Sequence, residues 1–217
     1  MPSARDERLA TLHDRAEALL RGAPDGGRSW GRAERLYGLG RRLARQEEAD
    51  RFIVGGAALL HERPDPEVAA ELALAGVPQP TAEMIRGAIA GLSRDDLRGE
   101  SLETRVLWDA HRLDRLGAFG IANVLLEGGQ QGEELYERRD PFALLRSLAP
   151  DRYLLERIYE RLAALPHLMH TPTGRRIAVR RVGIMLFYLE ALRDELAETL
   201  PDALLPEADW LVPKEET

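Results

Sequence analysis

Residues 52–60 read FIVGGAALL, a run in which no side chain is charged or strongly polar. A helix at a protein surface keeps one polar face, whereas a helix that is apolar on all sides is buried. The run therefore predicts a buried central helix over residues 48–61. Pro64-Asp65-Pro66 ends this helix, because proline does not fit inside a helix and restricts the residue before it.

The rest of the chain has the three-and-four spacing of amphipathic helices. In residues 6–21 this spacing places on one face Leu9, Leu12, Ala16, Leu19 and Leu20. Further helices are predicted over residues 30–45, 66–76, 81–92, 101–126, 150–165 and 171–199. Ser101 can cap the segment at 101–126. Thr171 or Thr173 can cap the last helix, where Pro172 suits the first turn.

Two glycines interrupt the apolar segment at 101–126. Gly117 and Gly120 would let another helix approach closely, or mark a bend, and residues 127–141 form the longest predicted loop. The sequence has no alternating strand pattern and no repeat. It therefore predicts an all-α protein, a single-domain helical bundle over residues 1–200, followed by a loosely held acidic tail at 201–217.

The composition narrows the classes of function. No cysteine is present, which excludes disulfides, thiolate metal sites and cysteine nucleophiles. No run approaches the roughly 20 apolar residues of a membrane helix, and the charged N-terminus lacks the apolar segment of a signal peptide, so we expect a cytoplasmic protein. A net charge of −7, from 37 acidic and 30 basic residues, argues against nucleic acid as the partner.

Three stretches carry a resemblance to a known family. They read SWGRAERLYGLGRRLARQEEAD at 29–50, VGGAALLHE at 54–62 and SLETRVLWDAHRLDRLGAFGIANVLLEGG at 101–129. In this order and spacing they resemble the HD-domain metal-dependent phosphohydrolases. The small bacterial members carry an Asp-Ala-Asp-Arg-Leu-Asp segment and a Gly-rich helix, which DAHRLD and LGAFGIA match here. The resemblance extends to LMHTPTGRRIAVRRVGIMLFYLE, covers roughly residues 25–197 and implies an HD-type helical fold.

The resemblance also implies a divalent metal, which the family holds with a histidine on an early helix, a His-Asp doublet and a later aspartate. Arg32 stands at the early histidine's position. His61 matches the doublet's histidine, but Glu62 replaces its aspartate. Asp109 matches the later aspartate, and His111 stands where the second acid of the Asp-x-Asp segment belongs. The metal motif is therefore degenerate.

The remaining positions of the motif are mixed. Arg112 and Asp114 match the family, whereas Leu92 falls where some members have an additional histidine. Arginine has no lone pair to offer a metal and keeps its charge. We therefore expect no metal cofactor, with the guanidinium of Arg32 replacing the cation and pairing with Asp109 and Glu62. The alternative is a residual metal site of His61, Glu62 and Asp109, which His111 joins only if the helix distorts, holding Mn, Fe, Ni, Zn or Mg.

Three functions follow from these two alternatives. The favoured one is a degenerate HD-domain protein that uses Arg32, His61 and Arg112 to bind a nucleotide or another phosphorylated ligand, or that binds a partner. The second is an active metal-dependent phosphohydrolase on a nucleotide or phosphomonoester. The third is a structural protein whose old pocket is filled by side chains. No catalytic residue is assigned, and the long last helix with its apolar FYLEAL face leaves room for a homodimer.

Other chemically suggestive residues have simpler explanations. His13-Asp14 spells the family doublet but lies on the first amphipathic helix, where surface chemistry is expected. His167 and His170 have no acid at helical spacing. The Gly128, Gly129 and Gly132 loop lacks the strand-to-helix context of a phosphate loop. Salt bridges to acidic helices are the simplest role for the basic stripe on the last helix, formed by Arg175, Arg176, Arg180 and Arg181.

Overall fold

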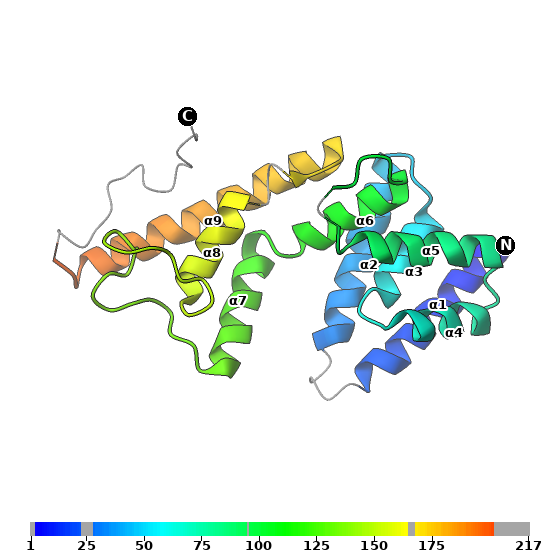
Figure 1. Ribbon diagram of the computed structural model, residues 1–217, viewed down its shortest axis with the longest axis horizontal. Helices are drawn as coiled ribbons and strands as arrows, with labels where there is room; N and C mark the ends of the chain where they lie inside the picture. Colours follow the sequence, from blue (N-terminus) through cyan, green and yellow to red (C-terminus); the bar gives the residue numbers. More distant parts are fainter. Residues whose placement is uncertain (1–2, 23–27, 95, 165–167, 202–217) are drawn as a thin grey trace. The chain divides into compact units, whose positions relative to one another are not determined.

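The computed structural model describes residues 3–22, 28–94, 96–164 and 168–201, and within them it is helical (Figure 1). The helices are α1 (Ala4–Arg21), α2 (Arg28–Gln46), α3 (Arg51–Leu60), α4 (Asp65–Leu74), α5 (Gln79–Gly91), α6 (Leu102–Leu113), α7 (Gly117–Gln131), α8 (Leu154–Ala164) and α9 (Pro172–Ala197). In this part of the chain β-structure is limited to one isolated bridge between Glu134 and Tyr153. The all-α prediction is confirmed, and residues 202–217 of the predicted tail lie outside the described residues.

The chain forms two compact units within the span predicted as one domain. Unit 1 comprises Met1–Asp114 together with His170–Gly174, and unit 2 comprises Arg115–Met169 together with Arg175–Thr217. Unit 1 therefore contains α1 to α6 and the first residues of α9, and unit 2 contains α7, α8 and the rest of α9. The single domain over residues 1–200 stays a prediction.

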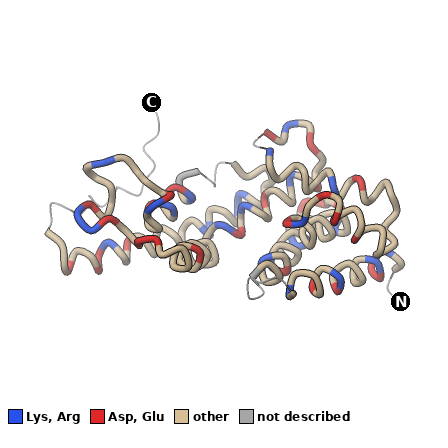
Figure 2. Tube along the Cα trace, turned by 60° about the horizontal axis from the view of Figure 1, so that its bottom comes forward, with Lys and Arg blue, Asp and Glu red and all other residues tan. Residues whose placement is uncertain are grey.

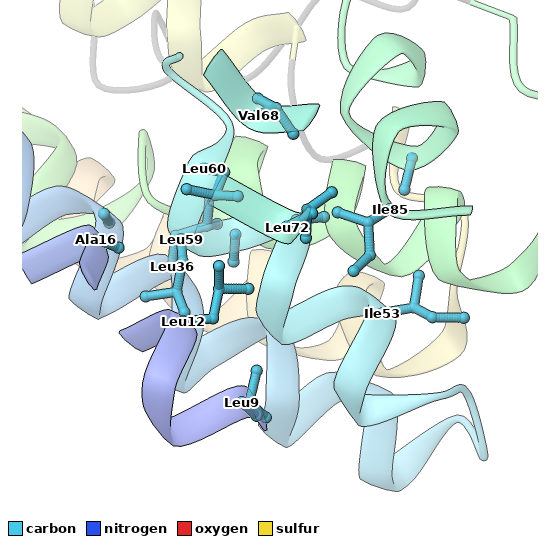
Figure 3. Packing of buried hydrophobic residues seen from close by; sticks show 14 of the residues in the cluster. Leu9, Leu12, Ala16, Leu36, Ile53, Leu59, Leu60, Val68, Leu72 and Ile85 are labelled. Atoms are coloured by element: carbon cyan, nitrogen blue, oxygen red, sulfur yellow. The ribbon is translucent and has the colours of Figure 1, made fainter. Parts of the chain in front are cut away.

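Helix α3 is the centre of unit 1, as the sequence predicts. Every residue from Phe52 to Leu60 is buried. Asp50 caps the helix, because its carboxylate accepts a hydrogen bond from the Phe52 backbone N–H at 2.9 Å. Figure 3 shows the surrounding side chains pointing toward α3 from four other helices: Leu12 of α1, Leu36 of α2, Leu72 of α4 and Ile85 of α5. This packing fixes the C-terminal end of α3, where the candidate site begins.

The segment predicted over 101–126 is two helices, so a single continuous helix is wrong, whereas the bend predicted as an alternative at Gly117 is present. Helix α6 ends at Leu113, and α7 begins at Gly117, whose φ of +74° is a left-handed conformation that favours glycine. The N-cap prediction for Ser101 is confirmed, because its hydroxyl accepts from the Thr104 N–H at 3.1 Å. Helix α7 continues to Gln131, so the first part of the predicted loop at 127–141 is also helical.

Gly120 has no room for a side chain. A methyl group added there would lie 2.2 Å from the backbone oxygen of Arg115, which cannot move without displacing the start of α7. We expect Gly120→Ala to lower the free energy of unfolding by about 1–3 kcal/mol, the usual cost of overpacking. Gly129 lies in the same helix with nothing within 4 Å of an added methyl. Gly129→Ala should instead raise the stability by about 0.5–1 kcal/mol. Urea unfolding of both variants measures the difference, and equal effects would contradict the packing.

Candidate functional site

His61 is placed by the end of α3 and is the first residue of the site. Its side chain is only 3% exposed, and its Nδ1 lies 2.8 Å from the Ala58 carbonyl oxygen. A carbonyl oxygen can only accept, so Nδ1 carries the proton and Nε2 presents its lone pair. Nε2 is buried without a hydrogen-bond partner and lies 3.6 Å from Oε1 of Glu62. Burial lowers the pKa of His61, which favours the neutral ring.

Arg32 reaches the same carboxylate from α2. Its Nη1 donates to Oε1 of Glu62 at 2.9 Å, and its Nη2 lies 3.1 Å from Nε2 of His111. Its Nε lies 3.9 Å from Oδ2 of Asp114. Because an arginine N–H only donates, Nε2 of His111 is the acceptor. The pairing of Arg32 with Glu62 that the sequence predicts is present.

Arg35 lies one helical turn after Arg32 and completes the group. Its Nε and Nη2 donate to the two carboxylate oxygens of Asp114 at 3.0 and 3.3 Å. Asp114 is 6% exposed, so this bidentate pair is largely shielded from water. We call Arg32, Arg35, Glu62, His111 and Asp114 the arginine cluster. Its two guanidinium groups balance its two carboxylates. Sequence reasoning did not include Arg35, although its spacing of three from Arg32 places both on one face of α2.

Asp109 does not face Arg32, so the predicted pairing of these two residues is wrong. Oδ1 of Asp109 accepts from the His170 backbone N–H at 2.8 Å. Oδ2 accepts from the backbone N–H and the hydroxyl of Thr171, at 2.8 and 2.7 Å. The side chain is fully buried, and this burial raises the pKa of Asp109. The carboxylate is occupied by the segment that leads into α9, a partner that local sequence patterns do not reveal.

Two carboxylates meet the N-terminus of α9. The Thr173 N–H donates to Oε1 of Glu47 at 2.7 Å, beside the bonds from Thr171 to Asp109. Thr171 also caps the helix, because its hydroxyl accepts from the Gly174 N–H at 3.0 Å, as one of the two predicted caps. Carboxylates stabilise the positive end of a helix. Asp109 and Glu47 therefore anchor the start of α9 in unit 1.

Arg112 lies over Trp108 rather than in the arginine cluster. Its guanidinium carbon is 4.8 Å from the Trp108 ring centroid, and the His170 ring meets the same indole edge-on at 4.7 Å. Nε1 of Trp108 donates to the Arg94 carbonyl oxygen at 3.1 Å. Within the described ranges no acidic side chain pairs with Arg112, and no contact joins it to Arg32 or His61. Its role in ligand binding stays a prediction.

The donor set does not fit a divalent cation as it stands. Among the residues that the structure describes, no group of three His, Asp or Glu side chains lies close enough to share a metal ion. Arg32 donates to Glu62, which is a predicted ligand, and Asp109 is held by the lead-in to α9. Of the three predicted ligands, His61 is the one whose ligand atom, Nε2, has no hydrogen-bond partner among the described residues. The residual site of His61, Glu62 and Asp109 is therefore not assembled in this conformation.

The other sequence candidates lie outside this site. The His13 ring packs against Trp30 and Tyr37, at centroid distances of 5.1 and 5.2 Å. Gly128 and Gly129 are part of α7. His167 lies outside the described residues.

A cavity of about 550 Å³ lies at the opposite end of α3, around its first turn. Its charged lining residues bond with one another: Arg5 donates to Asp50 at 2.6 Å, and Glu103 accepts from the Asp50 N–H at 3.1 Å. His61 follows the last turn of α3. This cavity is therefore no part of the candidate site.

No protein-family model matches the chain. The uncharacterized protein YpgQ of Bacillus subtilis is 28% identical, over 78% of this chain and 85% of its own. The crystal structure of B. subtilis YpgQ in complex with ADP has a TM-score of 0.74 and 25% identity, covering 89% of this chain and 97% of that one. A Bacillus thuringiensis protein described as an HD-superfamily hydrolase has a TM-score of 0.73 and 26% identity, over 89% and 98%.

The structure of the chain is similar to that of a protein described as an HD-superfamily hydrolase. The predicted HD resemblance and the HD-type helical fold are confirmed. In this HD fold, no helix of the described residues is long and apolar enough to cross a membrane. Basic and acidic residues are interspersed along the helices (Figure 2). The cytoplasmic location and the exclusion of nucleic acid stay predictions.

The three bonds to Asp109 make a sharp test of its role. In Asp109→Asn an amide N–H₂ replaces one carboxylate oxygen and faces a backbone N–H, which leaves buried donors unpaired. We expect a loss of about 1–3 kcal/mol or more in the free energy of unfolding. Asp65→Asn is the matched control, because Asp65 pairs with Arg86 at the surface and is 61% exposed. Asp65→Asn should change the free energy of unfolding far less than Asp109→Asn, because an exposed ion pair contributes little to stability. Similar losses in denaturant unfolding would contradict the anchoring role.

Proposed function

We propose that the chain is an HD-fold protein without the family's divalent metal, in which Arg32 supplies the positive charge and the site binds a nucleotide or another phosphorylated ligand. One observation carries the proposal. The guanidinium of Arg32 donates to Glu62, contacts His111 and approaches Asp114, which are the residues at or beside the positions of the metal motif. A fixed cation at this place opposes a divalent metal and favours an anionic ligand.

The exposure of the cluster indicates how an anion would enter. Arg32 is 35% exposed and Glu62 28% exposed, whereas Asp114 is 6% exposed and held by Arg35. Glu62 is therefore the partner that an incoming phosphate replaces at lower cost, because its carboxylate can turn to water. A phosphate oxygen on Arg32 then keeps the charge-assisted bond, and Asp114 with Arg35 stays in place.

The ligand class is supported by a relative. The YpgQ protein of B. subtilis, 25% identical with a TM-score of 0.74, was crystallised in complex with ADP. Arg112 is a second cation without an acidic partner in the described residues, and its guanidinium stacks on Trp108. We therefore propose ADP or a related nucleotide as the first ligand to test.

The proposal predicts ADP binding that needs no metal. Calorimetric titration of the whole chain with ADP should give the same Kd with and without a chelator. Arg32→Gln should raise this Kd about tenfold or more, because a charge-assisted hydrogen bond contributes about 1.5–3 kcal/mol. Arg98→Gln is the control, since Arg98 is 92% exposed and bonds to Asp96. ADP binding that appears only with added metal, or an unchanged Kd in Arg32→Gln, would rule out the assigned role of Arg32.

A second candidate function is a metal-dependent phosphohydrolase with a reduced site. It is favoured by one observation, the buried Nε2 lone pair of His61, which has no hydrogen-bond partner and lies 3.6 Å from Glu62. A nitrogen lone pair beside a carboxylate is the start of a metal site. This function has two requirements. Arg32 must move away from Glu62, and Asp109 must keep a lone pair for the metal.

Rebuilding the motif separates the two functions. The double variant Arg32→His and Glu62→Asp restores the histidine, the His-Asp doublet and the aspartate of the family. We expect it to bind about one Mn²⁺ or Ni²⁺ per chain in calorimetry, while the unchanged protein binds none. The control variant combines Glu62→Asp with Arg45→His, which adds a histidine about 20 Å further along α2. A stoichiometric metal on the unchanged protein would favour the phosphohydrolase. No metal on the double variant would show that position 32 does not face the old metal site.

A further inference from the structure

Helix α9 exposes an apolar stripe on unit 2. Val179 is 69% exposed, Ile184 43% and Phe187 73%, and all three lie on the middle turns of the helix. Its buried side chains, Ala178, Met185 and Leu189, lie on other faces. Val179, Gly183 and Phe187 follow one another at intervals of four residues, so they form one line along the helix. Exposed apolar side chains in a line along a helix can form part of a protein interface.

The charges on either side of the stripe have opposite signs. Toward the N-terminus, α9 exposes the basic residues Arg175, Arg176 and Arg180. Toward the C-terminus it exposes the acidic residues Glu190, Asp194 and Glu195, of which Asp194 pairs with the neighbouring Arg193 at 3.2 Å. Seven residues separate Gly183 from Arg176 on one side and from Glu190 on the other, and this spacing keeps all three on one face. From the N-terminal to the C-terminal end of α9, the exposed face therefore carries basic, then apolar, then acidic residues.

We propose that this face of α9 binds a second copy of the chain, with the two helices antiparallel and a two-fold axis near Gly183. In this arrangement Val179 meets Phe187 of the partner subunit, and Arg176 meets Glu190 of the partner subunit. The same contacts recur on the other side of the axis, as a two-fold interface requires. A parallel arrangement places arginine against arginine, which opposes binding.

Gly183 supports the close crossing independently. Glycine inside a helix costs stability relative to alanine. A methyl group added at Gly183 would find nothing within 4 Å, so packing within one protomer does not require glycine here. At a crossing point the absence of a side chain lets two helix backbones approach. The glycine thus lies where the proposed two-fold axis needs it.

Charge reversal tests whether Arg176 and Glu190 interact between two chains, because an interaction within one chain would not be restored by mixing two variants. Sedimentation velocity of the full chain over a wide range of concentration should show a monomer–dimer equilibrium. Arg176→Glu or Glu190→Arg alone should raise the dimer Kd about tenfold or more, because like charges then face each other. A mixture of these two variants should form a heterodimer with Kd near that of the unchanged chain, since each new charge meets an opposite one. The double variant in one chain should also dimerise again.

Phe187→Glu tests the apolar part of the same face. It should raise the dimer Kd about a hundredfold, as expected for a central aromatic contact, and it should leave the helical circular dichroism unchanged because Phe187 is exposed. Leu74→Glu is the matched control, since Leu74 is 64% exposed on α4. A chain that stays monomeric at every concentration would overturn the proposal, leaving the face to a different partner. A dimer that ignores Phe187→Glu and the charge reversals would overturn it as well.

Discussion

The carboxylate of Asp109 accepts three hydrogen bonds from residues 61 and 62 positions later in the chain. These bonds hold the residues that precede α9 in unit 1. Glu47 is a second carboxylate at the same helix end, where it accepts from the Thr173 N–H. Since Asp109 uses its acceptors in this way, the arginine cluster takes its polar residues near the end of α6 from His111 and from the C-cap residue Asp114. Both of them contact or approach Arg32. The same hydrogen bonds that anchor α9 therefore also keep Asp109 out of the arginine cluster.

The electrostatics of the cluster follow from its balance of charge. Arg32 and Arg35 neutralise Glu62 and Asp114, and His61 beside them has a lowered pKa, caused first by burial. Adding a divalent cation to a balanced group brings it against two guanidinium charges with no spare carboxylate to offset them. In the family such a cation would balance the acids itself. Under the proposed function, the arginine at position 32 changes the kind of ion that the site accepts, while the fold around it is kept.

The sequence predicted the parts of the fold that depend on local pattern. The apolar run of α3 and the caps at Ser101 and Thr171 follow from residue type and spacing. The pairing of Arg32 with Glu62 followed instead from the resemblance to the HD family, which places both residues at positions of the metal motif. The missed features depend on contacts between distant segments. Asp109 was predicted to pair with Arg32, because no local sequence pattern reveals that residues 170–171 contact Asp109. The end of α6 was missed because Leu113 and Leu116 keep the helical spacing of apolar residues across the break at 114–116.

Arg32 and Glu62 are best understood as a matched pair of departures from the family motif. A guanidinium that extends from α2 needs an acceptor, and the additional methylene of glutamate extends the carboxylate at position 62 further from its backbone. Oε1 of Glu62 lies 2.9 Å from Nη1 of Arg32 but 3.6 Å from Nε2 of His61. The carboxylate thus bonds to the arginine and only approaches the histidine. Either substitution alone would leave a charged group of the half-buried cluster without its partner, which is costly. The two departures therefore stabilise one another, and beside them Nε2 of His61 lies buried without a hydrogen-bond partner.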